Sequence, residues 1–365
     1  MNMCGGAEWV AVNMINAVKA SDNEVVVLTN EKVDQRKIET LFGTKVFFDT
    51  EFAFPLEPFA TTDLHNVYTD AIRTLVFKIK CDVLVDTYSN ALLPGVNIAY
   101  IHFPFVGRIP QVQEMEKLTR KLKNSYYLPY VLYEHRKVRV ADQLILGNSM
   151  YTVQAIREKM GASANLLYPP ISREFFAYEE GVARSNTVVS VARISPEKGL
   201  TIIPQIASLT NKDVQFIIIG IKGSSEEFAR IVELSQKYKV ANRVKIMTNV
   251  SRSYLVNVLR KSKILFHPTI GEHFGVSIVE AMACGCISIV HNSGGPMEFV
   301  PKQYRFDNVS EAAEKIDKAF SDWSPRVASE FTLRAQQFTE DNFSPRFLRL
   351  FNSYLDKLEN CETSN

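Results

Sequence analysis

Residues 264–290 of the chain read ILFHPTIGEHFGVSIVEAMACGCISIV. The apolar runs at the two ends of this stretch, 264–267 and 287–290, have the length of buried strands, whereas residues 276–283 between them have helical spacing. A strand, a helix and a second strand in this order form a βαβ unit, in which the two strands are parallel. This stretch therefore predicts an α/β fold with a parallel sheet.

The same alternation of strands and helices continues through the rest of the chain. In the C-terminal half, helices are expected at 200–209 and 228–234, and further strands at 187–191, 215–219 and 244–247. The N-terminal half repeats the pattern less regularly, with strands expected at 24–28, 83–85, 98–102 and 143–146. We therefore expect two doubly wound domains, residues 1–180 and 181–343, which join near the polar segment 178–186.

The two ends of the chain carry signals of their own. Gly5 and Gly6 come after only four residues, although a doubly wound domain normally places a strand before its first glycine turn. We therefore expect the first strand to be missing or truncated. At the other end, Ser344 and Pro345 predict the start of a helix over residues 344–365, whose apolar face needs a surface to cover.

Composition narrows the class of protein. The 365 residues carry a formal net charge of +2 and 46% hydrophobic residues, which is typical of a globular protein and not of one that coats nucleic acid. No apolar run has the length of a membrane-spanning helix, and the first residues lack the basic segment of a signal peptide. The five cysteines show no metal-binding or disulfide spacing, so we expect buried thiols, no metal site and a cytoplasmic location.

Two glutamates mark the opening stretch as a candidate site. Glu272 lies in the loop after the strand 264–267, and Glu280, eight residues further on, lies on the helix that begins at Gly275. Open α/β sheets bind ligands at this edge, helix N-termini favour anions, and a carboxylate is a good acceptor for a sugar diol. Two glutamates at this spacing would more often be solvent-facing charges. Whether they form a ligand site therefore depends on the loops expected next to them.

Two further loops are expected at the same edge of the sheet. The segment VARISPEKGL, residues 191–200, offers Arg193 and Lys198 to a diphosphate, although a surface loop with two exposed cations is common. The segment SGGPME, residues 293–298, offers Gly294 and Gly295, which allow a backbone to approach a ligand closely. Three loops suited to phosphate or sugar at one edge are much less common by chance than any one of them.

These motifs resemble those of a known family. VARISPEKGL, GEHFGVSIVEAMACG and HNSGGP are similar to the donor-site motifs of nucleotide-sugar glycosyltransferases with the GT-B fold, specifically the retaining family 4. CGGAE, YIHFPF and LYPPIS fit as well, and the combination is most similar to the mannosyltransferases that extend dolichol-linked oligosaccharides with α-1,2-mannose. The resemblance implies two Rossmann-like domains facing a cleft, with a C-terminal helix that crosses back to the first domain.

The resemblance also implies roles for the matching residues. Arg193 and Lys198 would bind the donor diphosphate and neutralise the leaving group. Glu272 would hold hydroxyls of the donor sugar, and Glu280 would bind the ribose diol. His102 would lie near the reacting sugar carbon, although a lone histidine in such a loop is more often structural. Backbone contacts to the substrates would come from Gly5, Gly6, His273, Phe274, Gly275, Gly294 and Gly295.

The function implied is transfer of a hexosyl group, mannose in the closest resemblance, from a nucleotide-diphosphate sugar such as GDP-mannose to a lipid-linked or other glycan, with retention. The sequence has no D-x-D motif, the usual carboxylate pair that holds a metal on the nucleotide, so we expect metal-independent transfer without a cofactor. Two alternatives stay open. One is a sugar-nucleotide epimerase with the same fold, and the other is a catalytically silent protein that binds a sugar nucleotide.

One basic segment suggests a membrane contact. Between Lys117 and Arg139, lysines and arginines alternate with tyrosines and leucines. Such a segment suits an anionic lipid surface or a lipid-phosphate acceptor, which would place the protein peripherally on the cytoplasmic face of a membrane. A helical pair with a solvated basic face explains the pattern equally well.

Overall fold

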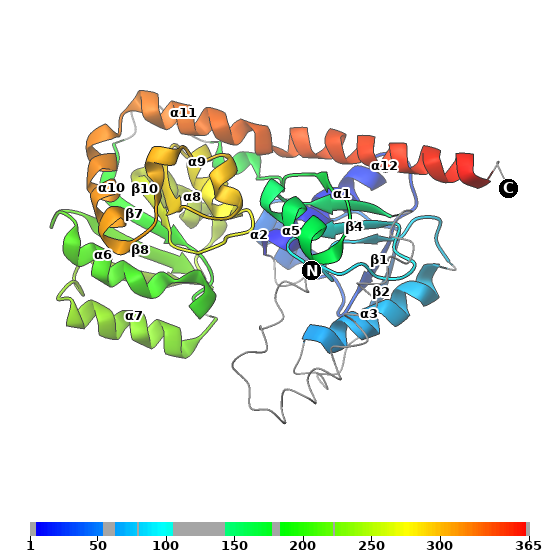
Figure 1. Cartoon of the computed structure of the whole chain (residues 1–365), viewed down its shortest axis with the longest axis horizontal. Helices are drawn as coiled ribbons and strands as arrows, with labels where there is room; N and C mark the ends of the chain where they lie inside the picture. The colour runs from blue at the N-terminus through cyan, green and yellow to red at the C-terminus, as the bar shows by residue number, and fades with distance from the viewer. Residues whose placement is uncertain are drawn as a thin grey trace. The chain divides into compact units, whose positions relative to one another are not determined.

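The computed structural model describes residues 5–53, 63–78, 80–104, 143–176, 183–221 and 223–362 (Figure 1). The chain divides into two compact units. Unit 1 contains Met1–Thr40, Thr44–Tyr168 and Ser344–Asn365, and unit 2 contains Leu41–Gly43 and Pro169–Phe343. The division after Tyr168 lies upstream of the expected boundary at residue 180. The basic segment 117–139 lies outside the described residues.

Unit 2 is built on a sheet of six parallel strands in the order β12–β11–β10–β7–β8–β9. The strand bounds are β7 Ser185–Val191, β8 Gln215–Gly220, β9 Val244–Thr248, β10 Ser262–His267, β11 Ile287–His291 and β12 Arg305–Phe306. The expected strands of this half are all present, with ends shifted by no more than two residues. Val188, Val189, Leu265 and Phe266 are fully buried, as expected for central strands covered on both faces.

Helices cover both faces of this sheet, which makes the unit doubly wound (Figure 1). One group of helices packs together on one face: α6 Ile203–Leu209, α7 Ser225–Lys237 and α10 Val309–Asp322. The other group is α8 Arg252–Lys261, α9 Val276–Ala283 and α11 Pro325–Ala335. The expected helix 276–283 is confirmed at both ends, whereas the expected helix 200–209 begins as a 3₁₀ turn, Leu200–Ile202.

The strand order creates one topological switch point. From β7 the chain builds outward through β8 and β9, and it then returns to β10 on the other side of β7 and builds outward through β11 and β12. The loops that follow β7 and β10 therefore diverge from neighbouring strands. In open α/β sheets the crevice at this point, at the carboxyl ends of the strands, is where ligands bind.

Unit 1 has the same kind of architecture with shorter elements. One sheet has the parallel order β3–β4–β5–β6, and β1 pairs with β2 in a second sheet. The strands are β1 Val26–Thr29, β2 Thr50–Ala53, β3 Val85–Asp86, β4 Ile98–Ile101, β5 Leu144–Gly147 and β6 Asn165–Leu166. The helices are α1 Gly6–Lys19, α2 Gln35–Phe42, α3 Asp63–Lys78 and α5 Met150–Met160. The α/β fold class expected from the sequence is confirmed in both units.

The C-terminal helix corrects one prediction. Helix α12 spans Glu340–Glu362 and begins ahead of the predicted start at Ser344 and Pro345, so Pro345 lies inside the helix. The residue that precedes the helix is Thr339, whose carbonyl oxygen accepts the N–H of Phe343 at 3.0 Å. The Ser-Pro pair was a misleading signal, because Pro at the start of a helix and Pro one turn later look alike in a sequence.

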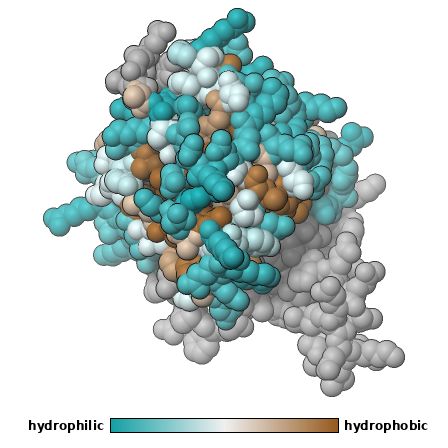
Figure 2. Space-filling model, turned by 90° about the vertical axis from the view of Figure 1, so that its left-hand side faces the viewer, coloured by the Kyte–Doolittle hydropathy of each residue, from teal (hydrophilic) through white to brown (hydrophobic). Residues whose placement is uncertain are grey.

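One face of the described chain is largely polar. Figure 2 shows one face of unit 2, on which hydrophilic residues dominate and hydrophobic residues form separate small patches. Scattered exposed apolar residues of this kind are normal for a globular protein. Among the described residues, no helix has the length and apolar character needed to cross a bilayer.

Candidate functional site

Three loops at the carboxyl ends of β7, β10 and β11 form the candidate site. The loop after β7 carries Lys198 at the end of the 3₁₀ turn Pro196–Lys198, and the loop after β10 carries Glu272. These two loops leave the sheet on either side of the switch point. The Lys198 Nζ atom donates to Glu272 Oε2 at 2.6 Å, so the two loops meet through this ion pair.

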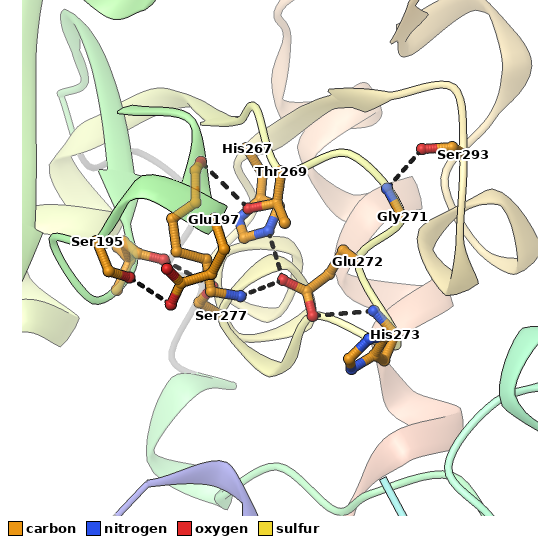
Figure 3. Close-up of polar contacts among 11 residues, drawn as sticks. Ser195, Glu197, His267, Thr269, Gly271, Glu272, His273, Ser277 and Ser293 are labelled. Carbon is orange, nitrogen blue, oxygen red and sulfur yellow. Dashed lines mark hydrogen bonds and ion pairs between the residues drawn. The ribbon is translucent and has the colours of Figure 1, made fainter. Parts of the chain in front are cut away.

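The Glu272 carboxylate is held from three directions (Figure 3). Its Oε2 atom accepts from Lys198 and lies 3.0 Å from Nε2 of His267, the last residue of β10. Its Oε1 atom accepts the backbone N–H of His273 at 3.0 Å. Burial alone would raise the pKa of this carboxyl, but the hydrogen bond with His267 and the Lys198 charge outweigh burial and hold the pKa well below its usual range. Glu272 is therefore ionised at neutral pH.

The loop after β11 supports the Glu272 loop through its backbone. The N–H of Gly295 donates to the Glu272 carbonyl oxygen at 2.8 Å, and the hydroxyl of Ser293 accepts the N–H of Gly271 at 2.8 Å. Gly294 has φ +78°, and a Cβ atom there would overlap that same carbonyl oxygen. Gly294 and Gly295 thus allow one loop to pack against the other, and the close backbone approach seen here is to the chain itself.

Helix α9 starts directly behind the Glu272 loop. Gly275 precedes the helix with φ +86°, and its carbonyl oxygen accepts the N–H of Ile278 at 2.9 Å. Phe274 is buried against the rings of Phe299 and Phe338, with both centroids at 5.3 Å. The aromatic contacts anchor the loop, so that the first turn of α9 is presented at a fixed place at the sheet edge.

Glu280 lies on α9, where it is half-buried, and no hydrogen bond to its carboxylate is found among the described residues. Burial raises its pKa to about 7, with the Arg252 charge opposing the shift and the Glu174 charge adding to it. A carboxylate in this state has acceptor capacity available for a ligand that brings hydroxyl donors.

Arg193 is exposed in the loop after β7. The backbone around it is fixed, because the N–H groups of Ala192 and Ile194 donate to the Ile219 and Ile221 carbonyl oxygens at 3.1 and 3.0 Å. No hydrogen bond from the Arg193 guanidinium to another described residue is found. Burial opposes the shift, but the Ser195 hydrogen bond lowers the pKa of the nearby Glu197, and the Arg193 charge adds to this effect. The side chain extends from a rigid support and is able to reach an anion.

The remaining expected site residues belong to unit 1. His102 follows β4, where its N–H and that of Phe103 donate to Asn90 Oδ1, and its Nε2 atom lies 3.2 Å from the Thr87 carbonyl oxygen. A carbonyl oxygen can only accept, so Nε2 carries the proton. Gly5 precedes α1 with its N–H donated to Glu8 at 2.9 Å, and Gly6 is the first residue of the helix.

Sequence reasoning missed several side chains that organise the site. His267, the last residue of β10, directly contacts Glu272. Ser293 holds the Glu272 loop and in turn lies 2.7 Å from His291 Nδ1. The available signal was position, since His267 and His291 are the last residues of the neighbouring strands β10 and β11.

Comparisons with known proteins find related sequences. Residues 173–337 match the family described as Glycosyl transferases group 1. The chain is 30% identical over 196 residues to the mouse GDP-Man:Man(3)GlcNAc(2)-PP-Dol alpha-1,2-mannosyltransferase, covering 49% of this chain and 40% of that protein. It is 26% identical over 270 residues to the human protein of the same name, covering 69% and 52%. The chain thus spans about half the length of these relatives.

Solved structures show the same fold at low identity. The chain is similar to WaaG, a glycosyltransferase involved in lipopolysaccharide biosynthesis, with a TM-score of 0.70, 13% identity and coverage of 93% of this chain and 94% of that one. It is also similar to Anabaena HepE in complex with UDP and glucose, with a TM-score of 0.68, 16% identity and coverage of 96% of both chains. The fold is that of the GT-B glycosyltransferases.

Proposed function

We propose that this chain, in which residues 173–337 form a group 1 glycosyltransferase domain, transfers a hexosyl group from a nucleotide-diphosphate sugar to a lipid-linked glycan with retention of configuration. The donor in our proposal is GDP-mannose. Mannose, guanosine diphosphate and a dolichol-linked acceptor appear in the names of the mouse and human relatives.

The observation that carries the proposal is the Lys198–Glu272 pair at the switch point between β7 and β10. A sugar nucleotide combines a negatively charged diphosphate with a polyhydroxylated ring, and this pair offers a cation and a carboxylate side by side. The ammonium of Lys198 suits the phosphate oxygens, and the ionised Glu272 suits sugar hydroxyls. Glu280, on the helix after the same loop, suits the ribose diol.

The two cations of the loop after β7 would supply the main catalytic effect. In glycosyl transfer the bond between the anomeric carbon and the phosphate oxygen breaks, and the leaving diphosphate takes the electron pair. Arg193 and Lys198 would neutralise the charge that develops there, and preorganised charges of this kind contribute several kcal/mol of transition-state stabilisation. We propose that these cations do so without a metal ion.

The acceptor in our proposal is a dolichol-linked glycan, and it would meet the donor sugar near His102. His102 in unit 1 would lie near the reacting carbon, and the names of the relatives suggest a dolichol-diphosphate oligosaccharide as the acceptor. An enzyme with such an acceptor would work at a membrane surface, and we propose the cytoplasmic face, where sugar nucleotides are available. The basic residues of segment 117–139 would assist this contact.

The first test is thermal unfolding with GDP, UDP, ADP and their sugar derivatives. A ligand at about 100 times its Kd adds roughly 2.7 kcal/mol to stability, enough for a clear shift. We expect GDP and GDP-mannose to stabilise the wild type and not the Lys198→Met variant. Stabilisation by none of the nucleotides, or an equal shift in the variant, would contradict the proposal.

The second test is transfer itself. Radiolabelled mannose from GDP-mannose should appear in a dolichol-linked oligosaccharide. An α-specific exomannosidase should release the label and a β-specific one should not, because transfer with retention keeps the α-configuration of the donor. The same reaction in EDTA should proceed within about twofold if no metal is required. Release of an altered free sugar nucleotide without any acceptor would instead identify an epimerase.

A further inference from the structure

We infer that His267 is a positioning residue that fixes the Glu272 carboxylate through its Nε2–H group when Lys198 turns to the donor diphosphate. The inference rests on the proposed function for its catalytic meaning, and on the contacts of one carboxylate oxygen for its geometry. That oxygen, Glu272 Oε2, is shared between Lys198 Nζ at 2.6 Å and His267 Nε2 at 3.0 Å (Figure 3).

The two partners of this oxygen differ in mobility. Lys198 lies in a loop turn on a flexible four-carbon stem, and its side chain is 26% exposed. His267 ends β10, which lies between β7 and β11 in the sheet, and its side chain is only 4% exposed. The histidine is therefore held by the sheet, whereas the lysine is able to move with little loss of packing.

An arriving diphosphate would compete with Glu272 for the lysine. Its oxygens carry at least two negative charges, and ammonium groups form their strongest hydrogen bonds to such anions. The carboxylate would then keep two contacts, with His267 and with the backbone N–H of His273. These contacts would hold it in place for sugar hydroxyls while Oε2 regains an acceptor position.

The chemistry of the pair fixes the proton of the histidine. An ionised carboxylate has no proton to donate, so a hydrogen bond to Nε2 requires the proton on Nε2. His267 performs this task as a neutral ring as well as a charged one. Among the described residues, no other side chain hydrogen bonds to the Glu272 carboxylate apart from Lys198 and His267.

The functional test compares two variants of the whole chain. His267→Leu fills the space without a donor, and His267→Gln places an amide N–H near the position of Nε2. We measure Kd for GDP and for GDP-mannose. The ratio of Kd for GDP to Kd for GDP-mannose gives the contribution of the sugar to binding. His267→Leu should reduce that ratio about tenfold, as expected for a lost hydrogen bond to a charged group, with Kd for GDP changed less than twofold. His267→Gln should recover most of the contribution.

Two results would overturn the inference in this test. Equal losses in the leucine and glutamine variants would show that His267 acts through its volume alone. A parallel loss of GDP affinity would show that the whole donor site had been disturbed, and thermal unfolding of both variants without ligand detects misfolding.

A second measurement needs no ligand and so separates this inference from the proposed function. The chain has six histidines, and ¹⁵N-histidine labelling with the His267→Gln variant for assignment identifies the His267 signals. We expect Nε2 to be protonated at pH 8. A bare Nε2 would overturn the inference even if GDP-mannose binds. If no nucleotide binds, the proposed function fails, and the state of Nε2 still decides whether His267 donates to Glu272.

Discussion

At the scale of single residues, Glu280 has the most informative chemistry. Burial raises its pKa from the ordinary 4.5 to about 7, so near neutrality the protonated and ionised forms coexist. A ribose diol donates its hydroxyl protons and therefore needs the ionised form. Affinity for the donor should rise with pH through this pKa and level off above it.

We therefore predict that GDP-mannose binds about tenfold more tightly at pH 8 than at pH 6. The diphosphate of the sugar nucleotide does not titrate in this range, so isothermal titration at several pH values isolates the protein group. Glu280→Gln should bind more weakly at pH 8 and show little change with pH. An unchanged pH dependence in that variant would assign the effect to another group.

Gly294 provides a second prediction at this scale. An alanine at Gly294 would have to adopt the positive φ of +78°, and its Cβ atom would overlap the Glu272 carbonyl oxygen. The Glu272 loop must therefore shift in the Gly294→Ala variant. We expect a loss of stability of about 2–4 kcal/mol and loss of GDP-mannose binding.

Gly161 is a control for an alanine at positive φ without a clash: it has φ +65° and ψ +18°, whereas Gly294 has φ +78° and ψ −165°, and the space around the Gly161 Cβ position is open. Gly161→Ala should cost only the backbone term, about 1 kcal/mol, and leave nucleotide binding intact. Chemical denaturation of both variants provides the comparison. Equal destabilisation would show that backbone strain alone, and not loop packing, explains the role of Gly294.

At the scale of elements, the sequence predicted strands better than helix ends. The strands predicted in unit 2 are short runs rich in apolar residues, such as Phe216–Ile219 within β8, and runs of this length between polar segments are typical of buried strands. The two-residue strand β12 has no such run and was not predicted. Helices α5, α10 and α11 were not predicted, although Ser149, Asn308 and Ser324 each cap one of them by accepting a backbone N–H.

The site could be predicted to the level of loops but not of contacts. Strand ends and motifs brought Lys198 and Glu272 to one edge, since parallel strands end together. The contacts between the loops depend on backbone hydrogen bonds such as that from the Gly295 N–H to the Glu272 carbonyl oxygen. These bonds follow from three-dimensional packing, which the spacing of residues in a sequence does not show. The contact between His267 and Glu272 was not predicted for the same reason, because position at a strand end does not show which side chain a histidine contacts.

Helix α12 begins ahead of its predicted start, so Pro345 lies inside it, and this position leads to a prediction about stability. Pro345 has no N–H to donate to the Asp341 carbonyl oxygen, so one helical hydrogen bond is absent. Pro345→Ala should restore it and stabilise the protein by about 1–2 kcal/mol, after allowance for the greater freedom of the unfolded chain. A rise in Tm by calorimetry, with Ser344→Ala as the control, is the measurement. A fall in Tm would show that the proline ring contributes more through packing.

At the scale of the whole molecule, α12 connects distant parts of the sequence. Its residues from Ser344 onward belong to unit 1, where the buried Tyr354 hydroxyl accepts from the Asn97 side chain at 3.2 Å. Asn97 Oδ1 also accepts the N–H of Leu84 and the ammonium of Lys78. The C-terminal helix thus completes a polar network beside β3 and β4.

We predict that Tyr354→Ala destabilises unit 1 by about 3 kcal/mol through lost aromatic burial and an unpaired Asn97 amide. Hydrogen exchange should increase in β3–β6 while β7–β12 keep their protection. Tyr354→Phe retains the ring and should cost only about 1 kcal/mol. Uniform loss of protection across both sheets would indicate that the two units unfold as one.

Unit 1 is built from the N-terminal part of the chain together with the C-terminal helix. This has a consequence for synthesis on the ribosome. Residues up to Tyr168 emerge first, but helix α12, whose Phe347, Phe351 and Tyr354 are buried in the same unit, emerges only after all of unit 2. At about 5–20 residues per second, the first unit waits on the order of ten seconds or more with an uncovered apolar face. Unit 2, continuous from Pro169 to Phe343, is able to fold during that interval. Chaperone demand should therefore fall on the part of unit 1 that is made first, until helix α12 has left the ribosome.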